Sequence, residues 1–253
     1  MLAYQLDLEK LNAELGKKQP GEIIAWAVGQ FSPRFAMTSS FGPESGVLLH
    51  MVSAVDPATP VLFLETGYHF PETLEYKEKL TKLFGLRNVI DLRADVAKKA
   101  QVVNEYQGVP YEKNPDLCCQ INKVEPLQLA LKNYDAWMSG IRRNQTDNRK
   151  SIRILEEYEG DIFKVSPLAN FTSRDTWWYL KEHNIPQHPL FEKGYMSIGC
   201  WPCTRPIQAG DDERSGRWAG KSKKECGIHT FFKEIREAEE SPKEPPSDNS
   251  ANI

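Results

Sequence analysis

Apolar residues follow two alternating patterns along the chain. Short unbroken apolar runs predict buried strands at residues 34–40, 60–67, 88–93, 135–140 and 161–168. Apolar residues at helical spacing predict helices at residues 5–16, 20–31, 41–55, 70–85, 94–106, 118–133 and 173–186. Because strands and helices alternate through the middle of the chain, we expect an α/β fold with a doubly wound, mostly parallel sheet.

Three segments outside these strands and helices have no regular spacing of apolar residues. Residues 107–117 contain glycine and two prolines, and we expect a loop there. Residues 141–151 are dense in Arg142, Arg143 and Arg149, and a charge run of this kind is typical of a solvated loop. Residues 237–253 are polar and rich in proline, so we expect a disordered tail.

Length and charge narrow the class of protein. A chain of 253 residues is long enough for one large domain with a buried core and appended ends. The net charge of -3 gives no overall basic field of the kind that attracts a protein to nucleic acid or an anionic membrane. No window approaches about 18 apolar residues and the first residues do not resemble a signal peptide, so we expect a cytoplasmic protein.

Polar loops follow several of the predicted strands, where ligands bind in parallel sheets. Residues 39–45, SSFGPES, join a strand to a helix, and free backbone N–H groups at a helix start attract anions. Ser39, Ser40, Gly42 and Ser45 would face such a ligand. The loop lacks the GxxxxGK[ST] pattern of nucleotide triphosphatases. An ordinary strand-to-helix turn is the alternative.

The cysteines divide into two close pairs and a single residue. Cys200 and Cys203 form a CxxC pair, which suits zinc, a redox pair or half of an iron–sulfur site. Cys118 and Cys119 are adjacent at the expected start of a helix, which favours a multi-iron cluster. A structural zinc site is the rival, although zinc favours two CxxC pairs. Lys123 lies four residues beyond Cys119 and would stand beside the cluster, unless it is an ordinary surface lysine.

The fifth cysteine, Cys226, is a candidate nucleophile. Lysines precede it and His229 follows three residues later, so a place in an apolar core is the weaker interpretation. Arg214 and Arg217, three residues apart, suit the oxyanions of a ligand, although a solvated face is the alternative. Such cations would favour the reactive thiolate form of the cysteine.

Several motifs in order resemble the thioredoxin-dependent adenylyl-sulfate reductases of the PAPS/APS reductase family. The motifs are SSFGPES, LETGYHFPET, CCQINKVEPL, SGIRRNQ, GCWPCT, ERSGRW and KKECGIH, between about residues 39 and 229. The resemblance implies an adenine nucleotide alpha hydrolase-like fold of the PP-loop type with a mobile C-terminal segment. It also implies N-terminal helices at 1–30, a nucleotide-binding core at 31–198 and a CxxC and catalytic-cysteine segment at 199–236. Pro43 and Thr146 depart from the residues common at those positions.

The same resemblance implies the roles of particular residues. A [4Fe-4S] cluster would be held by Cys118, Cys119, Cys200 and Cys203, and Cys226 would be catalytic. Lys123, Arg214, Arg217 and His229 would gather around the phosphosulfate. The adenosine phosphate pocket would be lined by Ser39, Ser40, Gly42, Ser45, Glu65, Thr66, Gly67, Gly140 and Arg142.

The implied reaction is the reduction of adenylyl sulfate to sulfite and AMP. Cys226 would attack the sulfur and form an S-sulfocysteine, and thioredoxin or a glutaredoxin-like reductant would release sulfite. A reductase of the 3′-phosphorylated nucleotide is the nearest alternative. An ATP pyrophosphatase or tRNA-thiolating enzyme would need an SGGxDS loop, and a non-catalytic zinc module would make no sulfite. The oligomeric state is left open.

Overall fold

The computed structural model describes residues 6–158, 162–208 and 210–229. Within them six strands form one sheet in the order β3-β2-β1-β4-β6-β5. The strands are β1 (Phe35–Thr38), β2 (Val61–Leu64), β3 (Val89–Leu92), β4 (Ala136–Met138), β5 (Leu155–Tyr158) and β6 (Ile162–Val165). The expected tail at 237–253 and the end of the expected C-terminal segment lie outside the described residues.

The sheet is mostly parallel, which confirms the predicted fold class. β1 pairs in parallel with both β2 and β4, and β4 pairs in parallel with β6. The edge strand β5 is antiparallel to β6, with Leu155 opposite Val165. The sequence did not predict β5, because Glu156 and Glu157 interrupt its buried positions and leave no apolar run.

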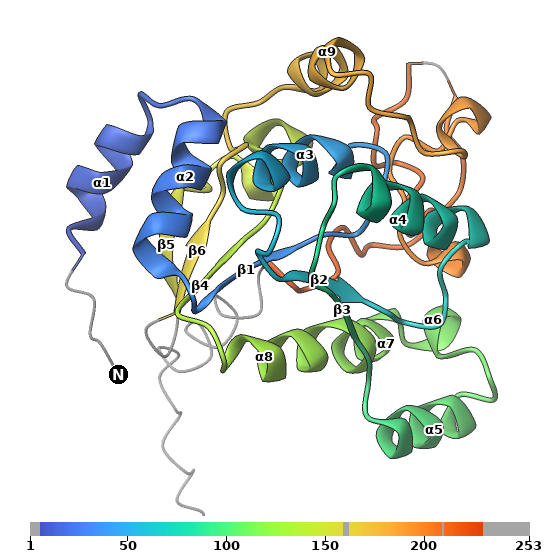
Figure 1. Cartoon of the computed structure of the whole chain (residues 1–253). Coiled ribbons are helices and arrows are strands. Elements are labelled where there is room, and N and C mark those ends of the chain that lie inside the picture. The colour runs from blue at the N-terminus through green and yellow to red at the C-terminus, as the bar shows by residue number, and fades with distance from the viewer. Residues whose placement is uncertain (1–5, 159–161, 209, 230–253) are drawn as a thin grey trace, which may run out of the picture.

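Helices cover both faces of the sheet (Figure 1). They are α1 (Leu8–Leu15), α2 (Pro20–Phe31), α3 (Ser45–Val55), α4 (Pro71–Leu83), α5 (Val96–Glu105), α6 (Pro110–Lys113), α7 (Pro115–Cys119), α8 (Glu125–Leu131) and α9 (Ser173–Glu182). The larger apolar cluster joins one sheet face to α2, α3 and α9, and a smaller cluster joins the other face to α8. Of the helices in the described ranges, none is long and apolar enough to cross a membrane.

The segment before the paired cysteines differs from the prediction. Residues 107–117 contain α6 and the start of α7, where a loop was expected. α7 begins at Pro115 rather than at the cysteines, because the side chain of Asn114 caps it by accepting a hydrogen bond from Leu117 N at 3.0 Å. Cys118 and Cys119 therefore end this helix. A π-helical turn, Gln120–Val124, continues from them into α8.

The sheet order sets the position of the ligand-binding edge. β1 is the point from which the chain winds in opposite directions, toward β2 on one side and β4 on the other. In doubly wound sheets, the loops beyond the carboxyl ends of such neighbouring strands flank a crevice. The loops after β1 and β4 therefore bring Ser39 and Gly140 to the same edge.

Candidate active site

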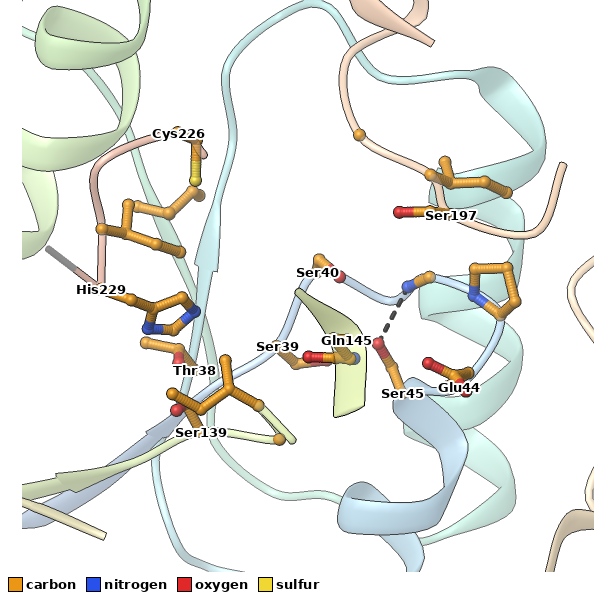
Figure 2. Close-up of a pocket in the computed structure, with 18 of the residues that line it drawn as sticks. Thr38, Ser39, Ser40, Glu44, Ser45, Ser139, Gln145, Ser197, Cys226 and His229 are labelled. Atoms are coloured by element: carbon orange, nitrogen blue, oxygen red, sulfur yellow. Dashed lines mark hydrogen bonds between the residues drawn. The ribbon is translucent and has the colours of Figure 1, made fainter. Parts of the chain in front are cut away.

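A cavity of about 230 Å³ lies at this edge, between the strand ends and the segment 196–229. Figure 2 shows Ser39, Ser40 and Ser45 on one side of it and Cys226 and His229 on the other. The residues expected at a ligand site that line it are Lys123, Arg214, Arg217, His229, Ser39, Ser40, Gly42, Ser45, Gly140 and Cys226. The fold thus brings together residues from five separate parts of the chain.

The loop after β1 is shaped by its own hydrogen bonds. Gly42 N donates to Ser45 Oγ at 2.9 Å, and Phe41 N donates to Ser39 Oγ at 3.2 Å. Phe41 has a positive φ of 47°, a conformation that its fully buried ring holds in place. The loop leads directly into α3, so the positive end of the helix dipole faces the cavity.

Arg142 lies behind this loop and is not among the residues that line the cavity. Its side chain is 1% exposed and its guanidinium pairs with the carboxylate of Glu44 at 2.6 Å. The guanidinium also donates to Ser173 Oγ at 3.4 Å. This burial shows that the expectation of a solvated loop was wrong for Arg142. The residue connects the loop after β1 to the start of α9.

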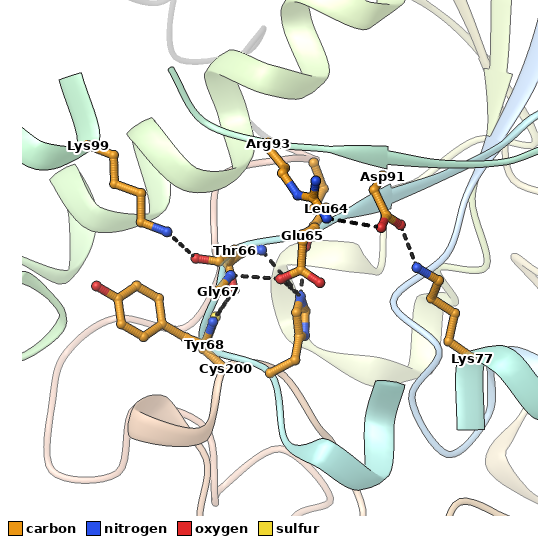
Figure 3. Close-up of polar contacts among 11 residues, drawn as sticks. Leu64, Glu65, Thr66, Gly67, Tyr68, Lys77, Asp91, Arg93, Lys99 and Cys200 are labelled. Carbon is orange, nitrogen blue, oxygen red and sulfur yellow. Dashed lines mark hydrogen bonds and ion pairs between the residues drawn. The ribbon is translucent and has the colours of Figure 1, made fainter. Parts of the chain in front are cut away.

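The segment 65–67 also lies outside the cavity lining, beside Cys200 (Figure 3). Gly67 N donates to Glu65 Oε1 at 2.8 Å, and Lys99 Nζ donates to the carbonyl of Thr66 at 2.7 Å. Thr66 Oγ1 lies 3.4 Å from the sulfur of Cys200. The contact of Thr66 with Cys200 connects the loop after β2 to the CxxC segment.

The two cysteine pairs meet around a second, smaller pocket. Cys118, Cys119, Cys200 and Cys203 all line it, and all are free thiols. Burial raises the pKa of Cys118 to about 12, and the neighbouring cysteines add to the effect. Burial also raises the pKa of Cys119 to about 11. Within the described ranges, no three His, Cys, Asp or Glu side chains are grouped so as to hold a metal ion.

Lys123 lines both pockets and so connects the four cysteines to the cavity that contains Cys226. Burial alone would lower the pKa of Lys123. Its pKa is nevertheless raised, because the sulfurs of Cys200, Cys119 and Cys226 lie nearby.

Two arginines supply further positive charge to the cavity. The buried Nε atoms of Arg214 and Arg217 have no hydrogen-bond partner among the described residues. Burial lowers the pKa of Arg214 to about 10, and the nearby Arg149 contributes. The guanidinium of Arg217 lies 4.5 Å from the ring centroid of Trp218. Buried donors without a partner favour an anionic ligand that would accept from them.

His229 closes the other side of the cavity. Its ring stacks on Trp137, with 5.9 Å between centroids and 1° between planes. Burial, together with the charges of Lys164 and Arg149, lowers the pKa of His229 well below the usual value. The imidazole is therefore neutral at physiological pH. Its buried Nδ1 has no hydrogen-bond partner within the described ranges.

Sequence reasoning missed several residues of the cavity. Ser139, Gln145, Arg149 and Glu225 also line it. Arg149 was expected in a solvated loop, and this was wrong because its side chain is buried against Glu225. The one available signal was the acidic residue directly before Cys226, because a buried carboxylate needs a cationic partner.

The sheet is doubly wound, polar loops follow β1 and β4, and a thiol lies among cationic side chains in the cavity beside them. These features define an α/β enzyme for an anionic nucleotide. Residues 34–206 match the model of the phosphoadenosine phosphosulfate reductase domain, and the chain belongs to this family.

Relatives and solved structures agree with this family. An adenosine 5′-phosphosulfate reductase of Chelativorans sp. is 40% identical over 90% of this chain and 93% of its own length. One from Halalkalibacterium halodurans is 37% identical over 90% of this chain and 98% of its own length. A crystal structure of phosphoadenylyl-sulfate reductase from Candida auris, a phosphate complex, has a TM-score of 0.68 at 27% identity and covers 80% of this chain and 98% of that one. An FMN adenylyltransferase of Candida glabrata shares the fold alone, with a TM-score of 0.53 at 14% identity over 81% of this chain and 69% of that one.

Proposed function

We propose that this protein reduces adenylyl sulfate to sulfite and AMP, as the names of its relatives suggest. The observation that carries the proposal is the position of Cys226. Its thiol lines the same cavity as the cationic side chains of Lys123, Arg214 and Arg217. These cations would neutralise the phosphosulfate, which would otherwise repel a thiolate.

In the proposed reaction Cys226 is the nucleophile. Its thiolate attacks the sulfur, an S–S bond forms, and the bond from sulfur to the phosphate oxygen breaks so that AMP leaves with the electron pair. The thiolate of a thioredoxin-like dithiol then attacks the Cys226 sulfur and releases sulfite. The second thiol of the reductant resolves the mixed disulfide and returns Cys226 as a thiolate, while the reductant is oxidised by two electrons.

We also propose that Cys118, Cys119, Cys200 and Cys203 hold a [4Fe-4S] cluster. The support is that four free, largely buried thiols surround one pocket. Polar groups stand beside two of the sulfurs, since Asn122 Nδ2 lies 3.7 Å from that of Cys118 and Thr66 Oγ1 lies near that of Cys200. When bound, the cluster would supply fixed charge next to Lys123. Free thiols also suit the reducing cytoplasm, where we place the protein.

Anaerobic turnover with adenylyl sulfate tests the function. Without reductant, the wild-type protein should release one AMP per chain and gain the mass of one SO₃ group on the peptide that contains Cys226. Adding thioredoxin should release sulfite, whereas Cys226→Ser should give neither product. Adduct formation by the Cys226→Ser variant would overturn the proposal.

Two further measurements separate the rival functions. The structural neighbour from Candida auris is named for the 3′-phosphorylated nucleotide, so kcat/KM should be compared on both nucleotides. A clear preference for the 3′-phosphorylated one would change the substrate assignment. Metal analysis of the anaerobic protein should find iron and sulfide in equal amounts, whereas one zinc per chain would indicate a structural zinc site.

A further inference from the structure

The residue directly before Cys226 is held by a buried ion pair. Both oxygens of the Glu225 carboxylate accept from the guanidinium of Arg149, Oε1 from Nε at 2.8 Å and Oε2 from Nη2 at 2.7 Å. The side chains are 10% and 11% exposed. Thr146 Oγ1 donates to the same carboxylate at 3.3 Å. A bidentate ion pair of this kind fixes the orientation of the two side chains as well as the distance between them.

The pair joins two distant parts of the chain. Arg149 belongs to the segment after β4 and is 76 residues from Glu225. Its Nη1 also donates to Gln145 Oε1, so the arginine is held on its own segment as well. Glu225 in turn belongs to the segment that carries the thiol. The contact therefore fixes the catalytic-cysteine segment to the sheet edge.

Two lysines of this segment make weaker contacts with the rest of the chain, while His229 at its end stacks on Trp137. Lys221 Nζ donates to the carbonyls of Tyr111 and Glu112, and Lys223 pairs with Asp116, whose side chain is 78% exposed. Ion pairs with an exposed partner contribute little because water competes for both charges. In the Arg149–Glu225 pair both charges are withdrawn from water, so removing either partner leaves the other buried without its closest counter-ion.

Glu225 also contacts Arg214, one of the cations that line the cavity. Arg214 Nη2 lies 3.4 Å from Glu225 Oε2, so one carboxylate contacts two arginines. Burial by itself raises the pKa of Glu225, but the hydrogen bond and charge of Arg149 outweigh it, and the pKa is lowered. The carboxylate is therefore charged at neutral pH and can orient both guanidinium groups.

We propose that Arg149 and Glu225 form a latch that seats the Cys226 thiol in the cavity and orients Arg214. Both are positioning residues for the reaction, and this inference rests on the proposed function. Adjacent Cα atoms are 3.8 Å apart, so any displacement of Glu225 is passed on to Cys226. When this ion pair is broken, the loop after β1 keeps its structure, but Cys226 lies farther from the sulfur that it attacks.

The first test uses no substrate. The rate at which iodoacetamide alkylates Cys226, followed by mass spectrometry of the peptide that contains it, should rise at least about tenfold in Glu225→Gln and Arg149→Gln. Lys150→Gln is the matched control. Lys150 is the next residue after Arg149, and it pairs with Asp147 where both side chains are exposed. An unchanged alkylation rate in both latch variants, with unchanged thermal midpoints, would overturn the latch.

The second test measures the reaction. Both latch variants should lower the single-turnover rate of adduct formation at saturating adenylyl sulfate at least about tenfold, with a smaller change in KM. Arg149→Lys should recover only part of the rate, because lysine keeps the charge but cannot form the bidentate hydrogen bonds of the guanidinium. The double variant should be no slower than the worse single variant, because the two residues act as a unit.

The outcomes separate this inference from the proposed function. A wild-type protein with no adenylyl-sulfate reduction would refute the function, while the alkylation contrast would still decide whether the latch exists. An active wild-type enzyme in which Arg149→Gln raises only KM and Glu225→Gln has no effect would refute the latch. Arg149 would then bind substrate directly.

Discussion

Gly199, just before the CxxC pair, allows Arg217 to reach its place in the cavity. A Cβ atom at this position would lie 2.6 Å from Arg217 Cζ, closer than real Cβ contacts allow. Gly199→Ala should therefore displace the guanidinium from Trp218 and raise KM for adenylyl sulfate roughly tenfold, the loss expected for one charge-assisted hydrogen bond. The thermal midpoint should change little, because the end of a flexible side chain can move away.

Gly29→Ala is the matched control for this prediction. Gly29 is exposed on α2, and an added Cβ atom there meets nothing within 4 Å. This variant should keep the wild-type KM and gain a little stability, since alanine is the better helix former. A wild-type KM for Gly199→Ala would show that Arg217 does not contact the substrate.

At the scale of single residues, the type of side chain was the property from which the sequence predicted the site. Cys226, Arg214 and Lys123 were expected near one ligand, and they line one cavity, while their roles stay predictions. The contact of Glu225 with Arg149 was not readable, because 76 residues separate the two and nothing local marks the pairing. A run of arginines has the same sequence pattern whether its side chains are solvated or pair with a buried carboxylate.

At the scale of elements, His188 joins α4 to the loop after α9. Its Nδ1 accepts from Leu190 N at 3.2 Å, so Nε2 carries the proton and donates to Thr73 Oγ1 at 3.0 Å. The side chain is buried, and burial lowers the pKa of His188 to about 4. Protonation would remove the hydrogen bond from Leu190 and place a charge in the interior.

The pKa shift of His188 predicts a loss of stability in acid. A base whose pKa is lower in the folded state makes no difference above the unfolded pKa of about 6.5. As pH falls from there toward 4, protonation of this histidine in the unfolded chain progressively lowers the free energy of unfolding, by about 3 kcal/mol in total. Chemical denaturation at pH 7.5, 6 and 5 should therefore show a smaller decline for His188→Gln than for wild type. Parallel declines would contradict the assignment, because the other histidines are common to both proteins.

The sequence predicted the types of the helices and strands better than their boundaries. The helical period beyond Cys118 was visible, but the cap at Asn114 placed the start of the helix at Pro115. The π-helical turn that follows has no apolar period of its own. Such a turn shifts the faces of a helix, so the expectation of Lys123 one regular turn beyond Cys119 rested on a geometry that the chain does not adopt. Lys123 nevertheless lies between the two pockets.

At the scale of the whole molecule, alternation predicted the class of sheet but not its strand order. The order β3-β2-β1-β4-β6-β5 depends on which side of β1 each crossover packs, and that choice is made by contacts between distant helices. It determines that the loops after β1 and β4 are neighbours. The cavity is therefore a property of the topology.

The charge of the molecule and the charge of the cavity have opposite effects on an anion. The chain carries a net charge of -3, whereas the cavity is lined by four cations, Lys123, Arg149, Arg214 and Arg217, against three carboxylates, Glu44, Glu213 and Glu225. KM for adenylyl sulfate should rise several-fold between about 50 and about 500 mM NaCl, because salt screens this local attraction. The value of kcat should change little, since the cations already contact the bound substrate.

Adenosine provides the uncharged comparison for this prediction. As a competitive inhibitor it lacks the phosphosulfate, so its inhibition constant should hardly depend on salt. Equal salt dependence for both molecules would mean that salt acts on the protein as a whole, for example by opening the segment that carries Cys226. A dependence confined to the anion would place the attraction in the cavity, because the negatively charged remainder of the molecule repels the same ligand.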